Sequence, residues 1–113
     1  MTNDPQAAGL VVAWLYRARP ERREDFEHAY GPDGVWARLF AGSDGFLGTE
    51  LRRDRDRYLV LDRWRSAEAY ERFGRVFESE YAALSAETRQ LYLEETRLGA
   101  FGHLAVPGTV TNA

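Results

Sequence analysis

Residues 45–77 constrain the fold more than any other part of the chain. Two runs of β-branched, apolar and aromatic residues flank a short charged break, Asp-Arg-Asp, at residues 54–56. After Ser66, a good helix N-cap, the apolar period changes from two to about 3.6. This pattern predicts a strand, a tight turn, a second strand and a helix. Turns of two and three residues give opposite pairings, so the register of the hairpin stays open.

The rest of the chain adds two strands and two helices to this unit. The expected strands lie at residues 10–17 and 91–101, and the expected helices at residues 20–31 and 33–42. Asp33 is expected to cap the second of these helices. The helix after Ser66 is expected to run for five turns, because apolar residues recur at three- and four-residue steps. These residues are Tyr70, Phe73, Phe77, Tyr81 and Leu84.

The resulting order of elements is β, α, α, β, β, α, β. It predicts an α+β, ferredoxin-like split βαβ fold, in which a four-stranded antiparallel sheet has its helices on one face. Apolar residues lie on both faces of the strands at 10–17 and 58–65, so the second face also needs a cover. Either loops or the sheet of a second subunit would supply it. We expect one domain at residues 10–101, a flexible N-terminus at 1–9 and an irregular tail at 102–113.

Composition excludes several classes of chemistry. The chain has no Cys and all fifteen basic residues are Arg, so thiolate sites, Schiff-base lysines and a P-loop lysine are ruled out. Its net charge of −3, with acidic residues interspersed, argues against nucleic-acid and membrane partners. His28 and His103 lie far apart, and we expect no metal site. Without a signal-peptide pattern or a ~20-residue apolar run, a cytoplasmic location is expected.

Several motifs together resemble one known family. They are Pro20 followed by an amphipathic turn at 26–30, Gly-Phe-Leu-Gly-Thr-Glu-Leu at 45–51, Asp-Arg-Trp-Arg-Ser at 62–66, Glu-Ala-Tyr at 68–70, and the closing strand at 94–101. In these the chain resembles the antibiotic biosynthesis monooxygenase domain family, which consists of small dimeric α+β barrels. The resemblance implies a homodimer whose two sheets face each other, with a cavity in each subunit between sheet and helices.

The resemblance also implies a function. Quinone-forming members oxidise electron-rich polycyclic phenols with O₂ and need no cofactor, so a small aromatic substrate and O₂ are the expected partners. Trp64 and Tyr70 match a Trp and a Tyr that line the cavity in those oxygenases, whereas Val60 stands where they have an Asn. Catalytic roles are therefore assigned to Tyr70 as hydrogen-bond donor, Trp64 as stacking partner and Asp62 as a weaker candidate base.

Further side chains are assigned to substrate binding, although each could instead belong to the core. They are Trp14, Tyr16, Trp36, Phe40, Phe73, Phe77 and Arg97. The strand-borne charges Glu50, Asp62, Glu95 and Arg97 are expected at strand ends or in pairs across the dimer. If a carboxylate faces an aromatic cavity instead, desolvation would raise its pKa and make it a usable base.

Two hypotheses remain open: a cofactor-independent monooxygenase, and a non-catalytic ligand-binding or interaction module on the same fold. A polar group on the cavity wall would favour the enzyme, and the absent Asn favours the module. Haem degradation, known in another branch of the family, is disfavoured. That branch relies on a Trp in the helix after the hairpin and on a His ten residues beyond it as the proximal ligand, and no His or Trp lies between Ser66 and Phe101.

Overall fold

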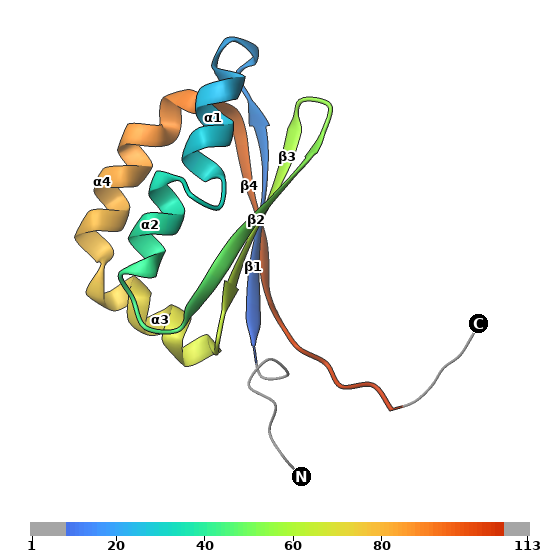
Figure 1. Ribbon diagram of the computed structural model, residues 1–113, viewed down its shortest axis with the longest axis vertical. Coiled ribbons are helices and arrows are strands. Elements are labelled where there is room, and N and C mark those ends of the chain that lie inside the picture. The colour runs from blue at the N-terminus through green and yellow to red at the C-terminus, as the bar shows by residue number, and fades with distance from the viewer. Residues whose placement is uncertain (1–8, 108–113) are drawn as a thin grey trace.

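The computed structural model describes residues 9–107 (Figure 1). Its elements are β1 (Leu10–Ala18), η1 (Pro20–Arg22), α1 (Arg23–Tyr30), α2 (Val35–Ala41), β2 (Phe46–Asp54), β3 (Arg57–Trp64), α3 (Ala67–Val76), α4 (Glu78–Thr88), η2 (Arg89–Leu91) and β4 (Tyr92–Gly102). The strands form one antiparallel sheet in the order β2-β3-β1-β4. The α+β, ferredoxin-like fold is confirmed. The N-terminal segment up to residue 8 and the tail from residue 108, both expected to be irregular, lie outside the described residues.

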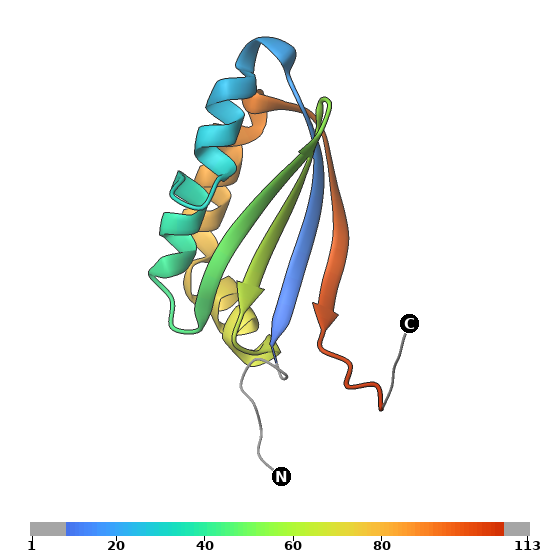
Figure 2. The ribbon, with the colours of Figure 1, turned by 45° about the vertical axis from the view of Figure 1, so that its right-hand side comes forward.

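All four α-helices lie on one face of the sheet, and its other face is bare (Figures 1 and 2). The covered face is the buried one: Tyr58, Val60, Asp62 and Trp64 of β3 are all buried against the helices. Leu59 and Leu61, which alternate with them, are half-buried on the bare face. Alternate residues of β3 therefore point to opposite faces of the sheet, as the strand period of two predicts.

The hairpin between β2 and β3 has a two-residue loop. Asp54 pairs with Arg57, and Arg55 takes a positive φ of 61°, as the first central residue of a type II′ turn does. This register places Thr49 directly opposite Asp62. A shift in the pairing between Phe46 and Gly48 marks a β-bulge at the start of β2.

An aromatic cluster fills the space between the sheet and the helices. Phe73 is 1% exposed, and its ring lies 5.1 Å from that of Phe40 and 5.4 Å from that of Trp64. At the other end of the core, Phe26 stacks on Tyr30 with ring centroids 4.3 Å apart. Rings of this size bury enough apolar area to dominate the stability of a small domain.

Two local expectations were wrong. The long helix after Ser66 breaks at Phe77 into α3 and α4, three residues after Gly74, whose low helix propensity makes this segment easy to bend. The N-cap of α2 is Gly34 in extended conformation, and the Asp33 side chain makes no capping bond. A Cβ at Gly34 would come within 2.3 Å of two backbone carbonyl oxygens, so only glycine fits at this cap.

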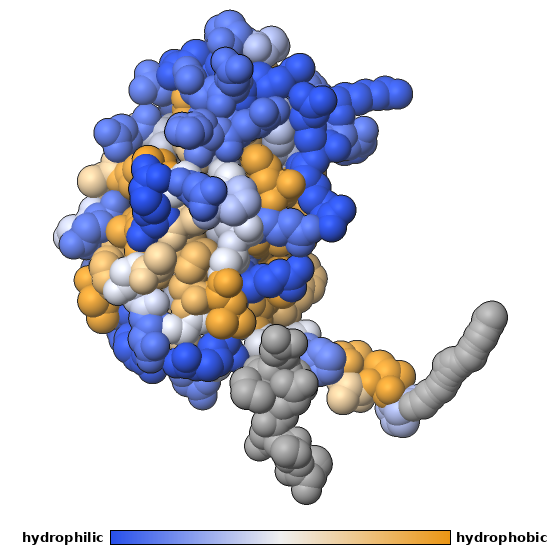
Figure 3. Space-filling view, in the orientation of Figure 1, coloured by the Kyte–Doolittle hydropathy of each residue, from blue (hydrophilic) through white to orange (hydrophobic). Residues whose placement is uncertain are grey.

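On the face of the molecule that Figure 3 shows, hydrophilic and apolar residues lie mostly in different halves. In Figure 3 the end that carries the hairpin loop is largely hydrophilic, whereas apolar residues gather in the opposite half. Beyond β4, Leu104 and Val106 are also exposed. None of the helices within residues 9–107 is long and apolar enough to cross a membrane.

We expect the bare face of the sheet to be covered by a second copy of the chain, because it carries Val11, Leu15, Leu59, Leu61 and the exposed Phe101. An interface of this kind buries about 2,000 Å² or more. Light scattering at micromolar concentration should therefore give the mass of a dimer. A stable monomer under these conditions would refute the expectation.

A pair of variants tests which face forms this interface. Leu61→Asp places a charge in the centre of the bare face and should yield monomers. Val76→Asp places the same charge on α3, where Val76 is already exposed, and should leave the dimer intact.

Candidate functional site

A cavity lies between the centre of the sheet and the helices. Its volume is about 30 Å³, and it is lined by Trp14, Tyr16, Tyr30, Trp36, Phe40, Val60, Asp62, Tyr81, Ser85 and Glu95. Five of these residues were assigned from the sequence to the site: Trp14, Tyr16, Trp36, Phe40 and Asp62. The walls are mainly aromatic, and two carboxyl groups are set into them.

Asp62 is the buried charge of this cavity. It is the third residue from the end of β3 and is 4% exposed, and its side chain lines the cavity, as its assignment as a candidate base requires. Burial raises the pKa of its carboxyl from 3.8 to about 6, and a hydrogen bond from Thr49 acts in the opposite direction. The Thr49 hydroxyl donates to Asp62 Oδ1 over 2.7 Å. A carboxyl with this pKa is ionised at neutral pH and can still accept a proton.

The second carboxyl, Glu95 on β4, is engaged by Tyr16. The Tyr16 hydroxyl donates to Glu95 Oε2 over 2.8 Å, across the pairing of β1 and β4. Burial, the neighbouring Tyr30 and the Glu95 charge all raise the pKa of Tyr16, so its hydroxyl stays protonated. From the sequence, Glu95 was expected at a strand end or in a pair across the dimer, with a cavity-facing carboxylate as the alternative; in the structure it lines the cavity.

Thr88, near the end of α4, holds two cavity side chains in place. Its hydroxyl oxygen accepts hydrogen bonds from Tyr30 Oη over 3.1 Å and from Trp36 Nε1 over 3.3 Å, and it donates to the Leu84 carbonyl. A buried threonine at the C-terminal end of a helix has no distinctive sequence signal. Sequence reasoning therefore missed Thr88.

Tyr81 extends from α4 toward the same cavity. Its ring packs edge-on against Trp36 with centroids 5.1 Å apart. Burial raises the pKa of Tyr81 to about 12, with further increases from Tyr70, Glu95 and Asp62 and a decrease from Arg97. Tyr81 is therefore within electrostatic range of both cavity carboxyls and of a guanidinium. In the sequence it was only one member of an apolar helical stripe.

Arg97 and Tyr70 lie next to each other, outside the set of residues that line the cavity. Arg97 Nη2 donates to Tyr70 Oη over 3.4 Å, and the guanidinium lies 5.9 Å from the centre of the Trp14 ring. This arrangement places a positive charge beside an aromatic wall of the cavity. Among the residues described, it is the guanidinium that lowers the pKa of Tyr81.

Three further residues assigned to the site pack in the core beside the cavity. Trp64 is 1% exposed and packs edge-on against Phe40, a cavity wall, at 5.6 Å. Phe73 is equally buried behind Phe40, and Phe77 stacks on Phe73 at 5.1 Å. In this conformation these three residues support the wall.

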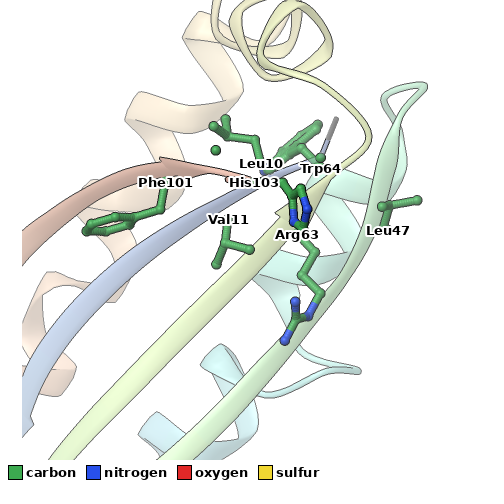
Figure 4. A pocket seen from close by; sticks show the side chains of 9 residues that line it. Leu10, Val11, Leu47, Arg63, Trp64, Phe101 and His103 are labelled. Atoms are coloured by element: carbon green, nitrogen blue, oxygen red, sulfur yellow. The ribbon is translucent and has the colours of Figure 1, made fainter. Parts of the chain in front are cut away.

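A larger hollow of about 710 Å³ lies at one end of the sheet (Figure 4). Val11, Leu47, Arg63 and Phe101 line it from the bare face of the sheet, and His103 comes from the segment after β4. The buried side chains of Leu10 and Trp64, at the ends of β1 and β3, also reach it. This hollow lies on the surface that we expect a second copy to cover. The interior cavity, with its buried carboxyl, is therefore the candidate site.

Within residues 9–107 no three His, Cys, Asp or Glu side chains come together as potential metal ligands. The polar groups in and beside the cavity include the carboxyls of Asp62 and Glu95, tyrosine hydroxyls and the Arg97 guanidinium.

A four-stranded antiparallel sheet with helices on one face and an aromatic cavity between the two layers defines a ferredoxin-like α+β protein with an internal site. The family model for antibiotic biosynthesis monooxygenase matches residues 9–75, more than half of the chain. The chain belongs to the antibiotic biosynthesis monooxygenase family. No curated protein matches it significantly.

Solved structures share the fold at low sequence identity. A variant of SnoaB, a cofactor-independent oxygenase from Streptomyces nogalater, is 19% identical with a TM-score of 0.61, over 94% of this chain and 100% of that one. PA3566 from Pseudomonas aeruginosa is also 19% identical with a TM-score of 0.61, over 88% and 98%. A conserved protein from Methanosarcina mazei is 9% identical with a TM-score of 0.65, over 88% and 97%. At such identities the likeness establishes the fold alone.

Proposed function

We propose that this protein is a cofactor-independent monooxygenase that oxidises an electron-rich polycyclic phenol, or a related aromatic, to a quinone with O₂. The observation that carries the proposal is the buried Asp62 carboxyl, with its pKa raised to about 6, in the wall of an aromatic cavity. The polar group that the sequence lacks at Val60 is supplied two residues later on the same face of β3. This favours the enzyme over the binding module.

Proton removal is the first step of the proposed reaction. Asp62 takes a proton from the substrate, and the anion that forms lies near the positive charge of Arg97. Trp14, Trp36 and Phe40 are placed to hold the aromatic rings by stacking and by excluding water. Tyr70 accepts a hydrogen bond from Arg97 and helps to orient this guanidinium.

The remaining steps need only O₂. The substrate anion gives one electron to O₂, and the substrate radical and superoxide combine to form a carbon–oxygen bond. The proton on Asp62 passes to the peroxide that results. The O–O bond then breaks as water leaves with the hydrogen of the same carbon. One oxygen atom ends in the new carbonyl group and the other in water, so atoms and electrons balance.

The cavity must widen before such a substrate can bind. Its volume of about 30 Å³ holds one or two water molecules, whereas pockets for drug-sized ligands have about 300 to 1,000 Å³. Helix α4 is the wall most easily displaced, because Thr88 is its only fully buried residue. Substrate binding is therefore expected to move α4 outward from the sheet.

The test is oxygen consumption by the purified protein, dialysed against a chelator and given no cofactor. With an anthrone as substrate, we expect O₂ uptake and quinone formation at least ~10-fold above the spontaneous rate. Heat-denatured protein at the same concentration is the control. A rate equal to the spontaneous one would reject the oxygenase, and tight binding of the anthrone without turnover would support the binding module.

A further inference from the structure

Three tyrosines line the cavity, and two of their hydroxyl groups are already engaged. Tyr16 donates its proton to Glu95, and Tyr30 donates to Thr88. The indole N–H of Trp36 is likewise bound to Thr88. These donors hold the walls together and would have to break a hydrogen bond within the protein before they could bind a ligand.

Tyr81 is different, because its hydroxyl makes no hydrogen bond to any residue in the part of the chain that the structure describes, 9–107. The Asp62 carboxyl is half engaged: Oδ1 accepts from Thr49, while Oδ2 accepts nothing from the described residues. A donor from α4 and an acceptor from β3 are thus both available at one cavity. Neither atom is fully buried, since Arg23 Nε is the only fully buried side-chain nitrogen or oxygen without a partner among the described residues. Both therefore remain accessible to water or to a ligand oxygen.

Tyr70, the donor assigned from the sequence, is placed less favourably. It does not line the cavity, and its hydroxyl oxygen already accepts a hydrogen bond from Arg97. The two tyrosines lie on different helices, α3 and α4. Because the helix breaks at Phe77, the direction of the Tyr81 side chain depends on the orientation of α4 and not on that of α3.

We propose that Tyr81, rather than Tyr70, donates the hydrogen bond that holds the oxygen of the bound phenol, opposite Asp62. This inference deepens the proposed function and rests on it. The ligand it implies is a phenol or phenolate whose oxygen lies between Tyr81 and Asp62, with its rings against Trp36 and Phe40. Because α4 carries Tyr81, the outward movement of this helix and the placement of the donor are coupled.

The first test measures binding without turnover. The probe is 2-hydroxyanthraquinone, a polycyclic phenol that is already a quinone and changes colour on ionisation. Loss of one hydrogen bond to a charged oxygen should weaken binding of its phenolate about 10- to 100-fold in Tyr81→Phe. The pKa of the bound phenol should rise in the same variant, because the donor favours the anion. Tyr58→Phe is the matched control: its hydroxyl donates to Glu27 outside the cavity, so this variant should bind the probe within about threefold of wild type. Tyr70→Phe should weaken binding less than Tyr81→Phe does.

The second measurement is the rate of anthrone oxidation by the Tyr81→Phe and Tyr70→Phe variants. Tyr81→Phe should lower it at least ~10-fold and Tyr70→Phe much less, since a positioned donor contributes 10²- to 10⁴-fold. Suppose that wild type does not oxidise the anthrone, but that Tyr81→Phe binds the probe more weakly than wild type and the control do. The oxygenase proposal is then rejected, and the assignment of Tyr81 as the donor to the ligand oxygen stands. The assignment is overturned if wild type does not bind the probe, or if Tyr81→Phe binds it as wild type does.

Discussion

The Asp62→Asn variant is expected to lose about 100- to 10,000-fold in kcat/KM for anthrone oxidation, because it cannot accept the substrate proton. In wild type the same parameter should rise with pH and level off above about pH 6, the pKa to which burial raises this carboxyl. The rise should be absent in the variant. Initial rates measured from pH 5 to pH 8 test both expectations.

The free energy of unfolding should depend on pH in the opposite direction to the activity: it should fall as the pH rises. The folded protein binds the Asp62 proton more tightly than the unfolded chain does, since its pKa is about 6 against an ordinary value of 3.8. Stability from this group is therefore complete below about pH 4 and is lost as the pH rises through about 6, by about 3 kcal/mol in all. Asparagine carries no charge and keeps an oxygen to accept from Thr49. Asp62→Asn should thus be about 1 to 3 kcal/mol more stable than wild type at pH 8 in urea melts, and about equal to it at pH 4.

Two further variants separate the role of Asp62 from general effects of charge. Asp54→Asn removes an exposed carboxylate that pairs with Arg57 at the hairpin loop, and it should change neither activity nor stability by much. Thr49→Val removes the hydrogen bond that lowers the pKa of Asp62, so the midpoint of the pH–rate profile should move upward. An Asp62→Asn variant that keeps more than half of the activity, or is less stable than wild type at pH 8, would contradict the assignment.

The Phe73→Ala variant is expected to lose about 3 to 5 kcal/mol of unfolding free energy. The ring is 1% exposed and contacts the rings of Phe40, Trp64 and Phe77, so its removal leaves a cavity that rigid aromatic neighbours cannot fill. A loss this large is a substantial part of the stability of a small domain. Chemical denaturation with near-UV circular dichroism measures it.

Variants of two nearby residues serve as comparisons for this loss of stability. Val76→Ala shortens a side chain that is 64% exposed, and the change should stay within about 0.5 kcal/mol. Phe77→Ala removes a half-buried ring and should fall between the two. A loss of under ~1 kcal/mol in Phe73→Ala would mean that the ring borders open space.

Much of the fold could be predicted from local patterns. The hairpin between residues 45 and 65 follows from two β-rich runs around a charged break, and the alternation of Tyr58, Val60, Asp62 and Trp64 follows from the strand period of two. The order of strands and helices then leaves few topologies, of which the split βαβ is one. These features are local, so a single sequence is enough to predict them.

The candidate site could be predicted only in part, because it depends on contacts between distant segments. The sequence places Trp14, Trp36 and Phe40 as candidate lining residues, but helical periodicity alone cannot distinguish a core ring from a cavity wall. Thr88 has its role only because α4 brings it to Tyr30, 58 residues earlier in the chain. No pattern within α4 marks it.

The sequence by itself determined the elements, their order and the residues that share a face. The tertiary structure alone decided which face of β3 the helices cover, and hence that Asp62 is buried opposite Thr49 in the wall of the cavity. It also decided that the helical stripe breaks at Phe77, so that Tyr81 reaches the cavity while Tyr70 is engaged with Arg97. The reason is physical: periodicity is set by the backbone within a few residues, whereas desolvation and hydrogen-bond pairing depend on which segments the fold brings together.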